Sequence, residues 1–270
     1  MSKTVLITGS STGIGKAAAR LFIEQGWNVA ASMRTPAKET ELKESEKVLL
    51  PTLDVTDEVT IRNALNETIQ HFGRIDVLVN NAGYGLSGTF ESMDMERIRR
   101  QFETNVFGLM ATCKAVLPHF REQGSGTLIN VASMGGRLTF PLYSVYHATK
   151  WAVDGFSESL QFELRPLGIR VRIIEPGAIK TDFYDRSADV AHDRDLHQYN
   201  DYVDRAMAKM NSAGDKGASP EVVAKAIYSA ATSESWKLRY TVGADARGLL
   251  GMRRMLSDGM YQAMIRKAIA

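Results

Sequence analysis

Cysteine and net charge are both scarce in this sequence of 270 residues. The single thiol, Cys113, excludes an intrachain disulfide and is compatible with a reducing cytoplasm, where we expect the protein to reside. Thirty-three basic and thirty-one acidic residues leave a formal charge of +2, too little to indicate a nucleic-acid or membrane-surface partner. No apolar run reaches the roughly 18 residues of a transmembrane helix. We therefore expect no membrane-spanning segment.

The chain also lacks a linker rich in proline, glycine or serine, and it contains no repeat. Short apolar segments alternate instead with segments of helical periodicity. The expected strands are Thr4–Thr8, Asn28–Met33, Val48–Asp54, Ile75–Asn80, Gly126–Ser133, Arg170–Glu175 and Leu238–Val242. The expected helices are Gly15–Gln25, Asp57–Phe72 with Thr56 as N-cap, Met95–His119 and Tyr146–Arg165. The alternation predicts βαβ units and a parallel sheet covered on both faces, in one domain spanning residues 1–270.

Two segments stand apart from this alternation. Residues 181–220 are polar and rich in Asp, and we interpret them as a substrate-loop insertion, because long insertions in compact domains are often lids or binding loops. Residues 245–270 mix apolar with basic residues, and we expect a C-terminal helical extension. Packing on its own domain is the favoured role of this extension. A partner subunit and a membrane interface remain alternatives.

A glycine-rich turn joins the first strand to the first helix: Thr8-Gly9-Ser10-Ser11-Thr12-Gly13-Ile14-Gly15. Glycine permits positive φ and a close backbone approach to a pyrophosphate, and the following helix offers unpaired N–H groups to an anion. The phosphate loop of ATPases is excluded, because Ser10 and Ala17 stand where that motif requires glycine and a hydroxyl residue. The turn therefore predicts a dinucleotide site.

The end of the second strand indicates which dinucleotide binds. The NAD pattern places an acidic residue there to bind the ribose 2′-hydroxyl, whereas this chain has Ser32-Met33-Arg34. The Arg34 guanidinium suits a 2′-phosphate, with which it can form two charge-assisted hydrogen bonds. We therefore expect NADP(H) rather than NAD(H).

Tyr146 and Lys150 are four residues apart, so on a helix they share one face. A cation beside a phenol favours the phenolate and lowers its pKa, which yields an acid–base group for use near neutral pH. Ser133 lies thirteen residues before Tyr146 in the sequence. Taken alone, a Tyr-x-x-x-Lys pair is more often two surface side chains; the surrounding motifs make it a candidate catalytic pair.

With these pieces together, residues Val5 to Gly243 resemble a single-domain short-chain dehydrogenase/reductase, similar to the steroid and retinol dehydrogenase branch. The resemblance rests on the glycine turn, Asp54-Val55, Asn80-Asn81-Ala82-Gly83, Asn105, Ser133, Tyr146-x-x-x-Lys150 and Pro176-Gly177. It implies a doubly wound parallel sheet of about seven strands with helices on both faces, and a homodimer or homotetramer.

The resemblance also implies residue roles. Tyr146 would be the general acid or base, and Ser133 would stabilise the substrate oxygen. Lys150 would bind the nicotinamide ribose, and Asn105 would hold a water that relays protons. The implied cofactor contacts, besides Tyr146 and Lys150, are Gly9, Ser11, Thr12, Gly13, Ile14, Gly15, Arg34, Asp54, Val55, Asn81, Ala82, Gly83, Pro176, Gly177, Ile179 and Thr181. No metal is required; His192 and His197 lack ligand-like spacing, and His147 should point away from Tyr146.

The substrate is less defined. The expected walls of its site come from 137–143, with Tyr84, Leu86, Phe183 and Tyr184 from two other loops. Such an apolar cleft suits a lipophilic ketone, aldehyde or secondary alcohol. We therefore interpret the chain as an NADP(H)-dependent oxidoreductase. The alternative is a catalytically silent NADP-binding redox sensor that acts through a protein partner.

Overall fold

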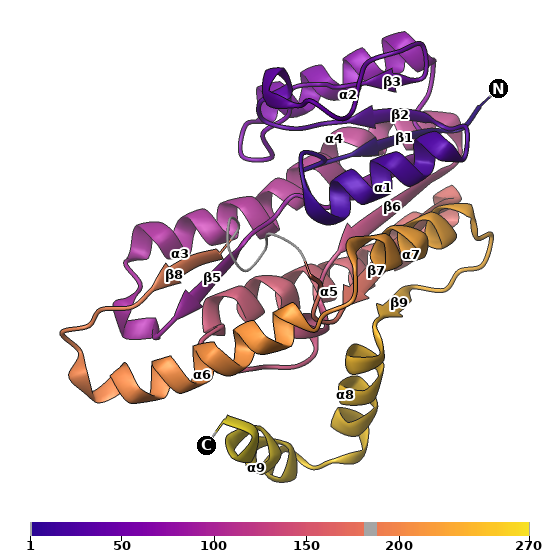
Figure 1. Cartoon of the computed structure of the whole chain (residues 1–270). Coiled ribbons are helices and arrows are strands. Elements are labelled where there is room, and N and C mark those ends of the chain that lie inside the picture. Colours follow the sequence, from indigo (N-terminus) through magenta and orange to yellow (C-terminus); the bar gives the residue numbers. More distant parts are fainter. Residues whose placement is uncertain (1, 181–187, 270) are drawn as a thin grey trace.

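The computed structural model describes residues 2–180 and 188–269. Its centre is a seven-stranded sheet in the order β3-β2-β1-β4-β6-β7-β9, in which every pair of neighbours is parallel (Figure 1). The strands are β1 (Thr4–Ile7), β2 (Asn28–Ala31), β3 (Val48–Leu49), β4 (Val77–Asn80), β6 (Gly126–Val131), β7 (Ile169–Pro176) and β9 (Arg239–Val242). The strand order reverses between β1 and β4, so the expected doubly wound fold in a single domain is confirmed.

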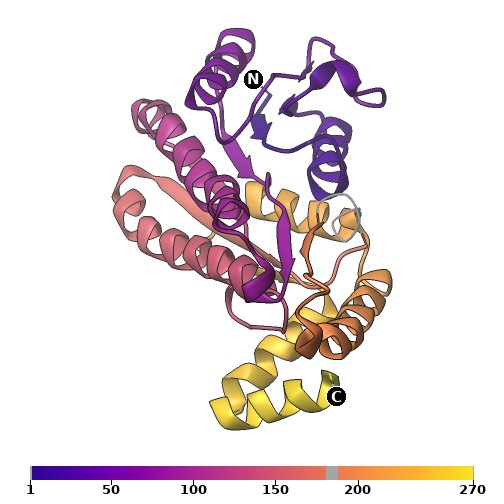
Figure 2. The same ribbon diagram turned by 90° about the vertical axis from the view of Figure 1, so that its left-hand side faces the viewer.

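Each face of the sheet is covered by helices, as Figure 2 shows. In β1, Val5 and Ile7 pack into one core and Leu6 into the other, because successive strand residues face opposite sides. The first core is covered by α1 (Gly13–Glu24) and α7 (Pro220–Thr232), and the second by α2 (Glu58–Phe72), α4 (Gly108–Gln123) and α5 (Ser144–Leu164).

Most ends of the expected elements shift by one or two residues, and three differences have a physical cause. The third strand is only Val48–Leu49, because Pro51 carries no backbone N–H for a continued ladder. The N-cap of α2 is Asp57 rather than Thr56, and its carboxylate accepts from the Val59 N–H at 2.8 Å. The expected helix Met95–His119 is α3 (Met95–Phe102), one π-helical turn (Glu103–Phe107) and α4. Such turns occur frequently at functional sites, and this one contains Asn105.

The described part of the insertion is ordered secondary structure rather than a loop. β8 (Ala188–Ala191) pairs in parallel with β5 (Gly85–Gly88), and α6 (His197–Asp215) follows. Two more helices, α8 (Ala244–Met255) and α9 (Asp258–Ile269), end the chain and lie outside the two main layers (Figure 1). Lys209 of α6 donates to the Ala268 carbonyl of α9 at 2.8 Å. Within residues 2–180 and 188–269, no helix is long and apolar enough to cross a membrane.

Candidate active site

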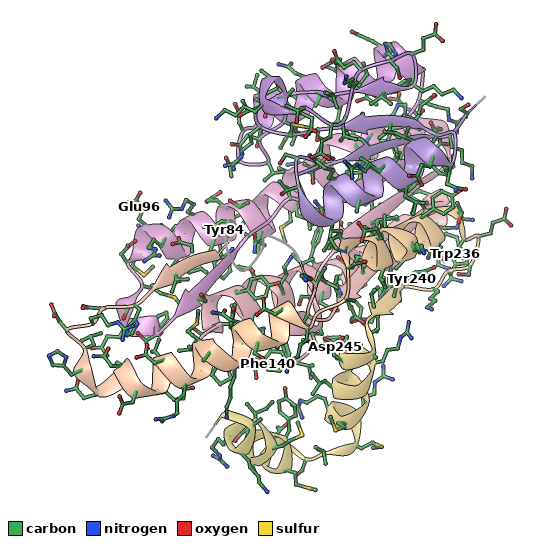
Figure 3. The ribbon with its side chains drawn as sticks, viewed as in Figure 1. Tyr84, Glu96, Phe140, Trp236, Tyr240 and Asp245 are labelled. Atoms are coloured by element: carbon green, nitrogen blue, oxygen red, sulfur yellow. The ribbon has the colours of Figure 1, made fainter. Side chains whose placement is uncertain are left out.

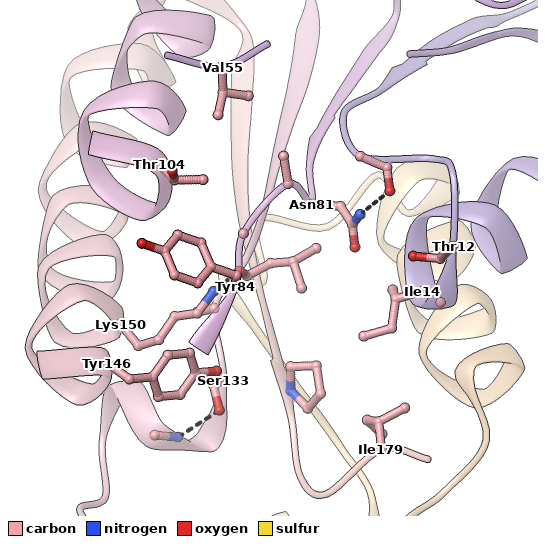
Figure 4. Close-up of a pocket in the computed structure, with 18 of the residues that line it drawn as sticks. Thr12, Ile14, Val55, Asn81, Tyr84, Thr104, Ser133, Tyr146, Lys150 and Ile179 are labelled. Carbon is pink, nitrogen blue, oxygen red and sulfur yellow. Dashed lines mark hydrogen bonds between the residues drawn. The ribbon is translucent and has the colours of Figure 1, made fainter. Parts of the chain in front are cut away.

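A cavity of about 760 Å³ lies where the strand order reverses. It collects nearly all the predicted cofactor residues and three of the four predicted catalytic ones (Figure 4). The predicted residues that line it are Gly9, Ser11, Thr12, Gly13, Ile14, Arg34, Asp54, Val55, Asn81, Ala82, Gly83, Ser133, Tyr146, Lys150, Pro176, Gly177 and Ile179. Gly15 and Asn105 pack behind its wall, and Thr181 lies outside the described residues.

The glycine turn is locked against the loop after β4. Gly9 has φ +69°, and a Cβ on it would lie 2.9 Å from the Ala82 Cα. A Cβ on Gly15 would lie 2.2 Å from the Gly9 carbonyl oxygen. The Asn81 amide donates to the carbonyls of Thr8 and Gly9 at 3.0 Å. A side chain at Gly9 or Gly15 would collide with the neighbouring backbone, and the Asn81 amide binds the carbonyls of the turn. The contacts therefore explain why Gly9, Gly15 and Asn81 occupy these positions.

Thr8 is a residue that the motif analysis left without a role. Its hydroxyl oxygen accepts from the N–H groups of Asn81 and Ala82, both at 3.0 Å, and so joins the two cofactor loops. Thr12, the N-cap of α1, makes no side-chain capping bond. The first N–H groups of α1 therefore stay available to an anion in the cavity.

Arg34 lies exposed at one end of the cavity, after β2. The other cations that line the cavity in the described chain are Arg100 and Lys150. Lys16, which follows the glycine turn, is held by Glu39 at 3.1 Å and by Glu41 at 2.9 Å. Arg34 follows β2, which pairs with β1 and so lies beside the glycine turn, and its contact with a phosphate stays a prediction.

Asp54 and Val55 form the wall beyond β3. The Asp54 carboxylate accepts from the Thr56 N–H at 2.9 Å and from its hydroxyl at 2.7 Å. Val55 is buried against Gly108, whose Cβ would lie 2.8 Å from the valine side chain. Glycine at the start of α4 is therefore a steric requirement of this wall.

Ser133 points into the cavity from the turn after β6, and Tyr146 and Lys150 point into it from α5 (Figure 4). The Ser133 Oγ accepts from the Gly135 N–H at 3.0 Å. The Lys150 Nζ donates to the Val131 carbonyl at 3.0 Å and lies 5.8 Å from the Tyr146 ring centroid. Burial lowers the pKa of Lys150 to about 8, since desolvation disfavours the ammonium. The three side chains thus line one cavity, and their roles in catalysis stay a prediction.

Asn105 is buried in the π-helical turn and its amide is engaged by protein groups. Its Oδ1 accepts from the Tyr84 N–H at 3.1 Å, and its Nδ2 donates to the Tyr84 carbonyl at 2.9 Å. It also donates to the Thr149 hydroxyl at 3.3 Å, next to Lys150 in the chain. The structure therefore places Asn105 between the loop after β4 and α5, and its role in a water relay stays a prediction.

Glu175 is a buried carboxylate next to the site, and the motif analysis did not identify it. It is fully buried, 3.3 Å from Arg137 and 3.4 Å from Arg239, and it accepts from the Thr241 hydroxyl at 2.8 Å. Arg137 follows the Ser133 loop, and Glu175 directly precedes Pro176. The ion pair between Arg137 and Glu175 therefore joins the loop after Ser133 to the loop that begins at Pro176.

The cofactor loop after β7 is also tied to the C-terminal helices. The Asp245 carboxylate accepts from the Ala178 N–H at 2.7 Å. A Cβ on Gly177 would lie 2.3 Å from the same carboxylate. Asp245 stands at the start of α8, where the chain leaves β9 (Figure 3).

The substrate side agrees only in part with the expected walls. Phe140, Tyr143 and Tyr84 line the cavity, together with Met134 and with Met210 of α6, which the motifs did not indicate. Leu86 is instead fully buried beside α3, and Arg137 turns back toward Glu175. Phe183 and Tyr184 lie outside the described residues.

The position of His147 differs from the one expected. His147 was expected to point away from Tyr146, yet it lines the cavity with its ring centroid 5.8 Å from that of the tyrosine. No group of three His, Cys, Asp or Glu residues in the described chain is suited to hold a metal ion. The wrong expectation arose because the Ser133–Tyr143 segment curls over this face of α5, which helical spacing does not reveal.

Comparisons with known proteins agree with this geometry. Residues 3–191 match the family model described as short chain dehydrogenase. A 3-ketodihydrosphingosine reductase from Bacteroides thetaiotaomicron is 34% identical over 263 residues, 97% of this chain and 96% of that protein. A short-chain dehydrogenase structure from Streptomyces avermitilis has a TM-score of 0.81 at 32% identity, covering 98% of this chain and 95% of its own.

Two similar structures contain nicotinamide cofactors. ElxO with NADP bound has a TM-score of 0.76 at 29% identity, covering 92% of this chain and all of its own. A 3-ketoacyl-(acyl-carrier-protein) reductase from Brucella melitensis complexed with NADH has a TM-score of 0.71 at 25% identity, covering 88% and 96%.

Proposed function

Because the chain belongs to the short-chain dehydrogenase/reductase family, we propose that it transfers hydride between NADP(H) and a lipophilic ketone, aldehyde or secondary alcohol. The family makes the protein an oxidoreductase that acts on carbonyl or CH–OH groups. The observation that carries the finer proposal is the placement of Ser133, Tyr146 and Lys150 along one cavity with the glycine turn.

The residues present fit a dinucleotide. Backbone at Gly9 and Gly15 leaves no space for a Cβ, and the N-terminus of α1 faces the same cavity. The bound nicotinamide supplies or accepts the hydride. Lys150 is buried beside Tyr146 and would hold the nicotinamide ribose.

The protein's own contribution is to position the substrate oxygen and to move one proton. The Ser133 Oγ already accepts from Gly135, so its hydrogen can be donated to the substrate oxygen and stabilise developing charge there. Tyr146 donates its phenolic proton to that oxygen in reduction and removes it in oxidation. The Lys150 cation stabilises the phenolate, and Asn105 would hold the water that returns the proton.

The preference for NADP(H) rests on Arg34, which lines the end of the cavity beside the glycine turn. Losing a charge-assisted hydrogen bond costs roughly 1.5–3 kcal/mol, or about one to two decades in affinity. Arg34→Asp should therefore raise KM for NADPH by that factor and favour NADH, with kcat little changed. The matched control, Arg121→Asp, makes the same charge change on α4. A wild-type enzyme that prefers NADH would contradict the assignment.

The substrate class rests on the apolar wall of Phe140, Tyr143 and Met210. The relative named 3-ketodihydrosphingosine reductase is in keeping with a keto group on a lipophilic molecule. NADPH oxidation should be measured with ketones and aldehydes of increasing chain length. We expect kcat/KM to rise with apolar length. NADPH binding without turnover on any carbonyl would favour the redox-sensor alternative instead.

We also propose a cytoplasmic homo-oligomer, in keeping with the single buried thiol of Cys113. Phe107 of the π-helical turn and Phe162 of α5 are 53% and 70% exposed and supply apolar surface. The neighbouring apolar residues Leu109 and Leu160 are instead buried in the protein's own core. Sedimentation at micromolar concentration should give a dimer or tetramer, and a species of 29.8 kDa would contradict the proposal.

A further inference from the structure

The segment from Ser133 to Tyr143 carries the catalytic serine and the apolar wall of the cavity. It leaves β6 and returns to α5 through Leu142, which has φ +66°. Two backbone groups of this segment meet one side chain. The His147 Nδ1 lies 2.9 Å from the Gly135 carbonyl oxygen, and the Phe140 N–H donates to the His147 Nε2 at 2.9 Å.

These two contacts fix the state of the imidazole. A backbone N–H can only donate, so Nε2 carries no proton, and Nδ1 must carry the one donated to the carbonyl. His147 is only 4% exposed, and burial lowers its pKa to about 4. The ring is therefore neutral at pH 7, and both of its nitrogens are engaged by the segment.

The contact with Gly135 leads directly to the catalytic serine. Gly135 uses its carbonyl to accept from His147 and its N–H to donate to the Ser133 Oγ at 3.0 Å. A Cβ on Gly135 would lie 2.7 Å from the His147 Nδ1, so ring and glycine are in close contact. The imidazole thus holds the Gly135–Gly136 peptide unit through its carbonyl, and the adjoining Met134–Gly135 unit, which shares the Gly135 Cα, donates its N–H to the Ser133 hydroxyl.

The contact with Phe140 leads to the substrate wall. The rings of Phe140 and His147 have centroids 5.8 Å apart, and Tyr143 packs against the same imidazole at 6.1 Å. Phe140 and Tyr143 both line the cavity. One side chain therefore holds the serine at one end of the segment and two aromatic wall residues at the other.

We propose that His147 is a positioning residue for the reaction, which holds the Ser133 hydroxyl through Gly135 and the apolar wall through Phe140. It exchanges no proton with the substrate. This inference rests on the proposed carbonyl reduction, since its kinetic effect needs that reaction. It adds to the family assignment a residue outside the Ser133, Tyr146 and Lys150 set.

The test compares His147→Phe with His147→Gln. Phenylalanine keeps the aromatic contacts and removes both hydrogen bonds, whereas glutamine offers one donor and one acceptor. Neutral hydrogen bonds are each worth up to about tenfold in an equilibrium constant. We therefore expect kcat/KM for a ketone to fall roughly tenfold to a hundredfold in the Phe variant, with NADPH affinity within about twofold of wild type. The Gln variant should recover much of the loss.

The control is His119→Phe. The His119 Nε2 also accepts from a backbone N–H, that of Ile75 at 3.1 Å, but His119 does not line the cavity. Its loss should lower thermal stability and leave kcat and KM unchanged. A His147→Phe variant that behaves like this control, or one that loses NADPH affinity as much as activity, would overturn the inference.

A spectroscopic measurement makes the result independent of turnover. Nitrogen-15 NMR of histidine-labelled wild-type protein should show His147 with Nδ1 protonated and Nε2 unprotonated between pH 6 and 8. The opposite tautomer, or titration near the ordinary value of about 6.5, would contradict the inference even if the Phe variant failed to fold. Wild-type protein that reduces no carbonyl would contradict the proposed function, while the tautomer measurement would still decide how His147 is held.

Discussion

The two sides of the cavity are built in different ways. The cofactor side is formed by loops that follow β1, β2, β3, β4 and β7; it is packed too tightly at Gly9 and Gly15 for a Cβ, and the Thr8 hydroxyl and the Asn81 amide join its loops. The substrate side combines the Ser133–Tyr143 segment with α6 and the C-terminal helices, and it is held by side chains such as His147 and Tyr261. The cofactor side therefore admits little change, whereas the substrate side depends on a few exchangeable contacts.

The C-terminal helices contribute to the substrate side without lining the cavity. Tyr261 of α9 is 4% exposed and donates to the Thr139 carbonyl at 3.2 Å. It packs with Leu138 and with Leu250 of α8. Residues remote in sequence thus fix the loop next to Phe140. The same helices also reach the loop after β7, where the Asp245 carboxylate accepts from the Ala178 N–H.

The largest expected effect lies where the two sides meet. Tyr146→Phe keeps the ring and removes the proton that is transferred, so kcat should fall by about 10²–10⁴-fold. NADPH affinity should stay close to wild type, because the cofactor loops are untouched. The control is Tyr228→Phe, in the aromatic cluster with Phe22 and away from the cavity. A Tyr146→Phe variant with more than about a third of wild-type kcat would contradict the role.

A glycine on each side gives a matched pair. A Cβ at Gly15 meets the Gly9 carbonyl at 2.2 Å, whereas a Cβ at Gly251 in α8 meets nothing within 4 Å. Gly15→Ala should lower the free energy of unfolding by roughly 1–3 kcal/mol through overpacking and weaken NADPH binding. Gly251→Ala should raise it by about 0.5–1 kcal/mol through helix propensity. Chemical denaturation measures both free energies of unfolding. Equal changes in the two variants would contradict the proposed difference in packing between the two sides.

Acid should act on the substrate side through His147. Its folded-state pKa of about 4 lies below the ordinary value of 6.5, so it contributes stability above pH 6.5 that is lost as pH falls toward 4. The loss between pH 7 and pH 5 should be roughly 2 kcal/mol. Chemical denaturation at the two pH values should show this decrease in wild type and a smaller one in His147→Gln. An unchanged decrease would assign it to other groups.

The smallest expected effect is that of the C-terminal contact. Tyr261→Phe removes the hydrogen bond to Thr139 and keeps the packed ring, at a cost of about 0.5–1.5 kcal/mol. The loop beside Phe140 should loosen, so KM for the ketone should rise while KM for NADPH stays constant. Tyr202→Phe on α6 is the control, because Tyr202 is 39% exposed and does not line the cavity. A rise in KM for both the ketone and NADPH would show that the substitution disturbs the whole fold rather than the loop beside Phe140.

The sequence alone determined the fold class, the succession of the seven strands along the chain and most of the residues that line the cavity. Both faces of β1 are apolar, with Val5 on one and Leu6 on the other, so the sequence pattern alone indicates a buried strand. The glycine turn directly follows this strand, so the predicted dinucleotide site could be located from adjacent residues. The Tyr146–Lys150 pair was readable for the same reason, since helical spacing places both on one face.

Only the tertiary structure decided what supports those groups. Glu175 and Tyr261 contact segments that are remote in sequence, and His147 contacts a loop that folds back over its own helix. Each of the three could equally be an ordinary buried or surface residue when only its local sequence is considered. The helix α6 was missed because its polar composition resembles that of a loop, while its residues Val203 and Ala206 are buried in one cluster with Leu142 and Tyr143. Periodicity records which residues share a face of an element; it carries no information on which distant segment will cover that face.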